Sequence, residues 1–81
     1  MKSLVAETLS AWREAERVLQ DLPADSARRP QITEIAGDLR ALHHRLIELR
    51  DPSHEALLDG RAHLHEALVR LDRARQEIAE R

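Results

Sequence analysis

The chain has 81 residues, of which 35% are charged and 42% are hydrophobic, and its formal net charge is −2. This balance is typical of a small folded domain with a charged surface, and it excludes a disordered acidic or basic tail. Because the chain has no cysteine, it has no disulfide framework, no thiolate chemistry and no Cys-based metal site. We expect residues 1–81 to form a single domain held together by apolar packing or by oligomerisation.

The first predicted helix spans residues 3–22. Ser3 is a suitable N-cap, and Glu7 places negative charge near the positive end of the helix dipole. Apolar residues recur along one face at helical spacing: Leu4, Val5, Leu9, Ala11, Trp12, Ala15, Val18, Leu19 and Leu22. Pro23 ends the helix, and we expect an irregular connection up to Pro30.

The second predicted helix spans residues 30–50 and carries the most regular apolar pattern in the chain. Six residues recur at steps of three and four and so share one stripe: Ile32, Ile35, Leu39, Leu42, Leu46 and Leu49. A stripe this continuous requires apolar surface from neighbouring helices to cover it.

The third predicted helix spans residues 52–79 and follows a short turn at Asp51-Pro52-Ser53, so it should fold back on the second helix as an antiparallel hairpin. Two lines of residues repeat every seven positions along it, a bulky line and a small one: Leu57, Leu64, Leu71 and Ile78, then Gly60, Ala67 and Ala74. These patterns predict an all-α fold, a small antiparallel three-helix bundle. The alternative is a helical hairpin protomer that forms a dimeric bundle.

Five histidines make a metal site the first chemistry to consider. In the predicted hairpin His43 lies level with residues 59–61, and Asp59 is one helical turn from His63, so these three side chains form a candidate ligand set. No Glu-x-x-His pair and no His-Glu-x-x-His motif accompanies them. We therefore predict no metal site and no cofactor, and keep a histidine-based metal-binding bundle as an alternative.

Other chemical and membrane functions lack their usual patterns. The sequence has no nucleophile elbow and no glycine-rich phosphate loop, so we predict no catalytic residue and no enzyme activity. Charges of both signs are interleaved, and the longest basic run is the pair Arg28-Arg29, so we expect no nucleic-acid partner. No apolar run is long enough to span a bilayer, and Glu7 comes too early for a signal peptide. We expect no membrane partner and a cytoplasmic location.

Recognition of another protein is the function that remains. Ile47, Leu58 and Val69 lie outside the apolar seams, and the first two are close to the hairpin turn, flanked by His54 and Arg61. We predict a protein interface at Ile47, Leu58, His54 and Arg61, for a protein partner or a second copy of the chain. A second interpretation stays open, in which Ile47 and Leu58 widen the core face. The predicted function is a non-enzymatic interaction module, such as an adaptor, regulator or inhibitor, and the alternative is a self-assembling structural subunit.

Overall fold

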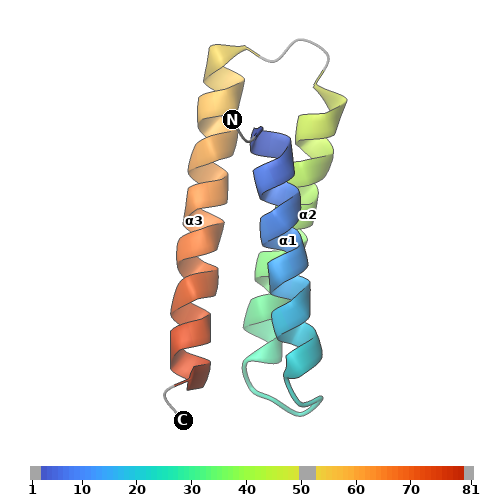
Figure 1. Cartoon of the computed structure of the whole chain (residues 1–81), viewed down its shortest axis with the longest axis vertical. Helices are drawn as coiled ribbons and strands as arrows, with labels where there is room; N and C mark the ends of the chain where they lie inside the picture. The colour runs from blue at the N-terminus through green and yellow to red at the C-terminus, as the bar shows by residue number, and fades with distance from the viewer. Residues whose placement is uncertain (1–2, 50–52, 80–81) are drawn as a thin grey trace.

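A computed structural model of the chain describes residues 3–49 and 53–79, which contain three helices: α1 (Leu4–Asp21), α2 (Arg29–Glu48) and α3 (His54–Ala79). In this bundle α2 runs antiparallel to both α1 and α3 (Figure 1). The predicted all-α three-helix fold is confirmed. The predicted turn residues Asp51 and Pro52, and the predicted helix boundaries at residues 50 and 52, lie outside the described residues.

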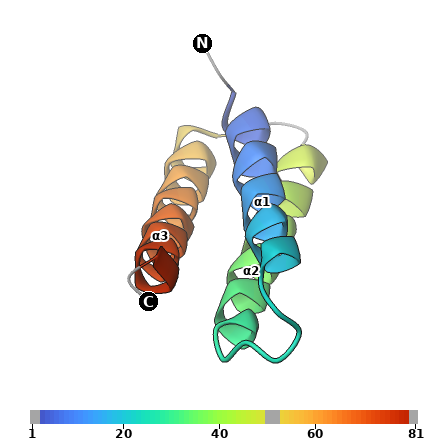
Figure 2. The ribbon, with the colours of Figure 1, turned by 60° about the horizontal axis from the view of Figure 1, so that its bottom comes forward.

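The arrangement is elongated, at 44 × 20 × 19 Å. Helices α1 and α2 form the most extensive contact, while α3 packs mainly on α2 and touches α1 least. Turning the bundle shows α1 in front of α2, with α3 to one side of both (Figure 2). Among the described residues no segment forms a strand, and none of the three helices has the length and apolar character needed to cross a membrane.

Serine side chains cap the first and third helices. Ser3 Oγ accepts a hydrogen bond of 3.1 Å from the backbone N–H of Ala6, which confirms the predicted N-cap of α1. Ser53 Oγ accepts a bond of the same length from the N–H of Ala56, so α3 begins in the same way. Each cap satisfies one of the amide groups that have no partner within the first turn of a helix.

Arg29 joins the first two helices. It is the first residue of α2, one position before the predicted start, and Pro30 lies in the first turn as expected. Its guanidinium Nη1 donates to the carbonyl oxygens of Leu19 at 2.8 Å and Leu22 at 3.2 Å. These carbonyls belong to the C-terminal end of α1, where few backbone N–H groups are available as donors; Leu19 O also accepts a bond of 3.2 Å from the N–H of Leu22. Arg29 therefore caps one helix while it starts the next.

Replacing Arg29 by alanine is expected to lower the free energy of unfolding by about 1–2 kcal/mol, because two partly buried carbonyl groups lose a charged donor. Urea unfolding followed by circular dichroism measures this loss. Arg13→Ala is the matched control: Arg13 is exposed on α1, and its removal should change stability by less than about 0.5 kcal/mol. Equal effects of the two variants would contradict a capping role for Arg29.

The predicted burial of the apolar stripe of α2 is confirmed for most of its residues. Five of its six residues are buried: Ile32, Ile35, Leu39, Leu42 and Leu46. On α3 the buried residues include the whole small line together with two of the leucines: Gly60, Leu64, Ala67, Leu71 and Ala74. Leu49 and Leu57 depart from the prediction, because they are 39% and 40% exposed.

The buried face of α1 differs more from its prediction. Its fully covered positions are mostly small: Leu4, Thr8, Ala11 and Ala15. Larger residues such as Trp12 pack on the edges of the core. The hydroxyl of Thr8 donates to the carbonyl oxygen of Leu4 at 2.8 Å, so this buried polar group is satisfied within its own helix. Small side chains at these positions let α1 lie close to α2.

Arginine side chains connect α3 to both neighbouring helices. Towards α1, Arg61 lies 3.3 Å from Glu7, and Arg75 lies 3.3 Å from Glu14. Towards α2, Arg70 contacts Asp38 at 3.0 Å. Each pair is solvent-exposed and therefore contributes only modestly to stability. Their shared effect is to favour one rotation of α3 about its own axis, and this rotation decides which of its residues face solvent.

Candidate interaction surface

The hairpin formed by α2 and α3 extends past the start of α1 (Figure 1). Gly60 marks the level at which α1 begins, because a Cβ atom there would lie 3.0 Å from Leu4 Cδ2 and 3.2 Å from Leu46 Cδ2. Residues 47–49 and 54–59 therefore lie beyond the first residue of α1. Among the described residues no third helix covers this region, and its large apolar side chains are exposed.

We call this region the hairpin tip and define it by four residues: Ile47, Leu49, Leu57 and Leu58. They are four of the six large apolar residues that the described part of the chain leaves exposed. Apolar residues gathered at one end of a small protein indicate a contact surface more than scattered ones do. The tip includes both apolar residues that the sequence predicted for the interface.

Ile47 and Leu58 are equally exposed, at 55% and 54%, but they occupy different helices. Ile47 follows His43 by one helical turn on α2, and the His43 ring lies 5.9 Å from the Trp12 ring of α1. Ile47 therefore continues the side of α2 that faces α1. Leu58 lies on the opposite side of α3 from the buried Gly60, Ala67 and their neighbours. That the two residues act as one patch stays a prediction.

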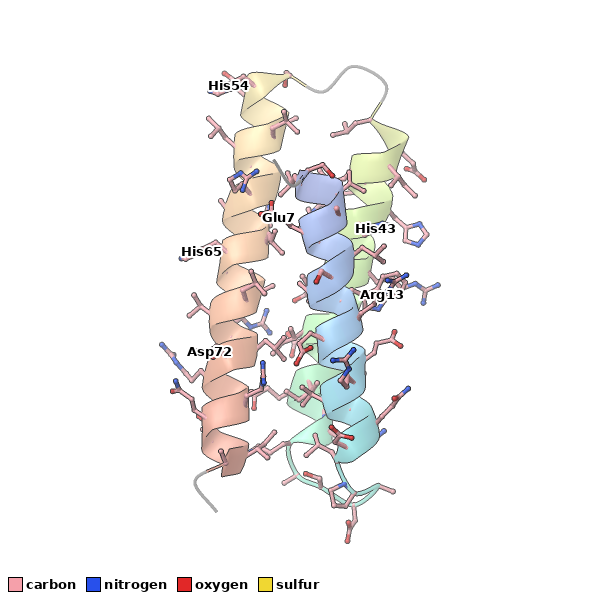
Figure 3. The ribbon with its side chains drawn as sticks, in the orientation of Figure 1. Glu7, Arg13, His43, His54, His65 and Asp72 are labelled. Carbon is pink, nitrogen blue, oxygen red and sulfur yellow. The ribbon has the colours of Figure 1, made fainter. Side chains whose placement is uncertain are left out.

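The two polar residues of the predicted interface are both on α3. His54 is the first residue of the helix and is exposed. Figure 3 shows His54 and His65 on the side of α3 that points away from α1, with Asp72 further along the helix. Arg61 lies 3.3 Å from Glu7 and keeps 58% of its side chain exposed. Leu58, His54 and Arg61 thus belong to one helix surface.

Two further apolar residues continue this surface. Leu68 and Val69 are 41% and 43% exposed, and they follow Leu57 and Leu58 by eleven residues, which is about three helical turns. The same side of α3 therefore carries two apolar pairs, one at the tip and one halfway along the helix. The sequence identified Val69 as lying outside the seams, but it did not relate Leu68 and Val69 to the tip. The eleven-residue spacing was the available signal.

We call this surface the outer stripe of α3 and define it by eight exposed residues: His54, Leu57, Leu58, Arg61, His65, Leu68, Val69 and Asp72. Six of them recur at helical steps of four and three: His54, Leu58, Arg61, His65, Leu68 and Asp72. This is the spacing of a helix seam, but the described structure places no other helix over it. The stripe combines apolar residues with both signs of charge.

A groove on the other side of the hairpin has a different character. It lies between α2 and α3, has a volume of about 260 Å³, and has Leu39, Leu42 and Ala67 among its lining residues. Asp38 and Arg70, also on its lining, form an ion pair across it. The groove is therefore partly closed by a contact within the chain.

The candidate metal ligands are not gathered into one centre. His63 Nδ1 lies 3.5 Å from the Asp59 carboxylate, as their spacing predicts, while His43 packs beside Trp12 and His44. Across residues 3–49 and 53–79, no group of three or more histidine or acidic residues has the geometry to hold a metal ion. A stable zinc site usually has three or four protein ligands, so this arrangement does not favour one.

The two residues of the longest basic run, Arg28 and Arg29, have partners within the fold. Arg28 pairs with Glu77 of α3, and Arg29 caps α1. Both guanidinium groups are therefore engaged within the fold.

The chain matches no protein-family model, no curated protein and no solved structure. Its function is therefore inferred from its own geometry.

Proposed function

We propose that this protein is a non-enzymatic interaction module that binds a helical segment of a protein through the hairpin tip and the adjoining outer stripe of α3. The observation that carries the proposal is the stagger of the helices. Leu4 begins α1 level with Gly60, so within residues 3–49 and 53–79 no third helix covers the apolar residues of the tip. An exposed helix side with apolar residues at helical spacing suits a second helix laid alongside it.

The polar residues around the tip support the same proposal. Leu58 is flanked by His54 and Arg61, an arrangement of apolar centre and polar rim that is common in protein interfaces. Arg61 already has Glu7 as a partner within the chain, so contact with another protein would not bury an unbalanced charge. Aromatic side chains are absent from this surface, which points to a contact of modest affinity.

Photo-crosslinking in a lysate of the source cells tests this function. A photoreactive residue placed at Leu58 should form an adduct with a protein on irradiation. The same residue at Gly37 is the control and should form none, because Gly37 is exposed on α2 and a Cβ atom there would meet nothing within 4 Å beyond the neighbouring backbone of its own helix. The adduct should disappear when Leu68 and Val69 are both replaced by aspartate. Failure to form any adduct from Leu58, or equal adducts from both positions, contradicts the proposal.

A further inference from the structure

The residue types of the outer stripe are arranged symmetrically along α3. The packing of a single bundle does not require this symmetry. Its residues fall into pairs that lie at equal distances on either side of His63: Arg61 with His65, Leu58 with Leu68, Leu57 with Val69, and His54 with Asp72. Every apolar residue is thus matched by an apolar residue. At the two ends a histidine is matched by a carboxylate.

An antiparallel pair of identical helices converts this symmetry into contacts. When a two-fold axis passes beside α3 at the level of His63, each residue of the stripe lies level with its matched residue on the other copy. Leu58 then packs beside Leu68 of the second copy in the middle of the contact. Leu57 and Val69 lie on opposite edges of the stripe, so Leu57 is on the same flank as the second copy's Leu68, and Val69 on the same flank as its Leu58. His54 faces Asp72, and an imidazole can donate a hydrogen bond to a carboxylate or, when protonated, form an ion pair with it.

The centre of such a pair places Arg61 against His65. A neutral imidazole has one unprotonated nitrogen that accepts a hydrogen bond from a guanidinium group. The charge of Arg61 is also balanced by Glu7 of its own chain, at 3.3 Å. At the outer end, Asp72 is exposed and, within the part of the chain that the structure describes, accepts one long hydrogen bond of 3.5 Å from Gln76, which leaves its carboxylate able to contact a second helix.

A parallel pair of the same stripes would be unfavourable. Each residue would then face its own copy, so that Arg61 meets Arg61 and Asp72 meets Asp72. Like charges placed opposite each other repel. The order of charges along the stripe therefore selects the antiparallel arrangement.

We infer that the partner of the outer stripe is the same stripe of a second copy of this chain, bound antiparallel about a two-fold axis level with His63. The inference rests on the proposed function and deepens it by naming the partner. The nineteen residues from His54 to Asp72 extend over about 27 Å of helix, and a contact made by one helix from each copy belongs to the small, weak class of interfaces below about 1,200 Å². The dimer is therefore a reversible one.

Sedimentation velocity of the purified chain over a wide concentration range is the first test. The expected result is a concentration-dependent shift from monomer to dimer. A wild-type chain that stays monomeric up to about 1 mM overturns the inference, since a dissociation constant above that value corresponds to less than about 4 kcal/mol of binding.

Leu58→Asp should raise the dissociation constant of the dimer roughly a hundredfold, because the symmetric interface contains the substitution twice, at about tenfold for each copy. Ala41→Asp is the matched control, since Ala41 is exposed on α2 and lies outside both the hairpin tip and the outer stripe. It should leave the dissociation constant unchanged. Circular dichroism verifies that both variants remain helical. An effect of Ala41→Asp as large as that of Leu58→Asp overturns the assignment of the interface to the outer stripe.

Cysteine crosslinking tests the orientation, and the cysteine-free chain is well suited to it. His54→Cys and Asp72→Cys variants, mixed in a glutathione redox buffer, should form a disulfide-linked dimer. Each variant alone should not, because in the antiparallel pair the two identical positions are about 27 Å apart, far beyond the reach of a disulfide. Crosslinking of each variant with itself, and not in the mixture, would show a parallel pair and overturn the inference.

The photo-crosslinking experiment in lysate distinguishes failure of this inference from failure of the proposed function. If the chain is monomeric in isolation and the Leu58 adduct contains a different protein, the self-association inference fails and the interaction function stands. If Leu58 gives no adduct and the chain is monomeric, both fail.

Discussion

Replacing Leu39 by alanine is expected to lower the free energy of unfolding by about 2–5 kcal/mol, the range for deleting a buried leucine side chain and leaving a cavity. Leu39 is 0% exposed and lies in the middle of the α2 stripe, where both other helices pack. A domain of this size has a total stability of roughly 4–12 kcal/mol. One substitution should therefore remove a large share of it. Chemical unfolding in urea, followed by helical circular dichroism, measures the change.

Leu49→Ala is the control, because it deletes the same atoms from the same stripe. Leu49 is 39% exposed at the hairpin tip, so its replacement should cost less than about 1 kcal/mol. If the two variants lost equal stability, Leu49 would be covered in solution, either by a second copy of the chain or by a different position of α1. Repeating the Leu49→Ala measurement at several protein concentrations distinguishes these two causes.

The stripe of α2 could be predicted because its signal is local. Steps of three and four residues place Ile32, Leu39 and Leu46 on one side of any α-helix, whatever the rest of the chain does. The turn before α3 is short, so the antiparallel hairpin follows from chain geometry. Fold class and helix order therefore depend on patterns that a single sequence displays.

The face of α1 was harder to predict because the pattern there is ambiguous. Leu9 is apolar and Thr8 is polar, yet Thr8 is buried and Leu9 is only half-buried. The hydroxyl of Thr8 bonds to the carbonyl of Leu4, four residues earlier, which removes most of the cost of burying it. Hydrophobicity alone gives no indication of this bond. Close packing against α2 then favours the smaller side chain at the contact.

The exposed hairpin tip depends on how far the helices are shifted along one another. Repeats every seven residues place Leu57 near Leu64 around α3, at the border between the core side and the outer stripe, and the sequence accordingly predicts both in the core. Only Leu64 is buried, because α1 begins level with Gly60 and does not reach Leu57. This shift follows from packing between helices, which periodicity within one helix does not report.

The candidate interface was predicted in part. His54, Leu58 and Arg61 lie on one surface of α3, as their spacing allows, whereas Ile47 continues the side of α2 that carries His43. The proposed pairing of His54 with Asp72 could not be recognised in a single chain. The two residues lie eighteen positions apart on the same helix, so they cannot contact each other within one copy. The pairing acquires a physical meaning only when two copies are aligned.

Replacing Ala74 by leucine is the last prediction, and it tests how firmly α3 is held. Ala74 is 0% exposed, and the next residue, Arg75, lies 3.3 Å from Glu14 of α1. Three added carbon atoms have no room at such a position, so the free energy of unfolding should fall by about 1–3 kcal/mol. Ala6→Leu adds the same atoms at an exposed site on α1 and should change stability by less than about 0.5 kcal/mol. Urea unfolding at one protein concentration compares the two variants.

The opposite outcome for Ala74→Leu would also have a definite physical meaning. Because α3 touches α1 less than it touches α2, the larger side chain is accommodated only if α3 moves away from α1. Unchanged or increased stability would show that this movement costs little, and that the rotation favoured by Arg61 and Arg75 is not fixed. The outer stripe would then lose its defined position, and self-association should weaken in the same variant. A loss of stability with unchanged helicity supports the opposite view, in which the bundle holds α3 rigidly and presents the stripe in one orientation.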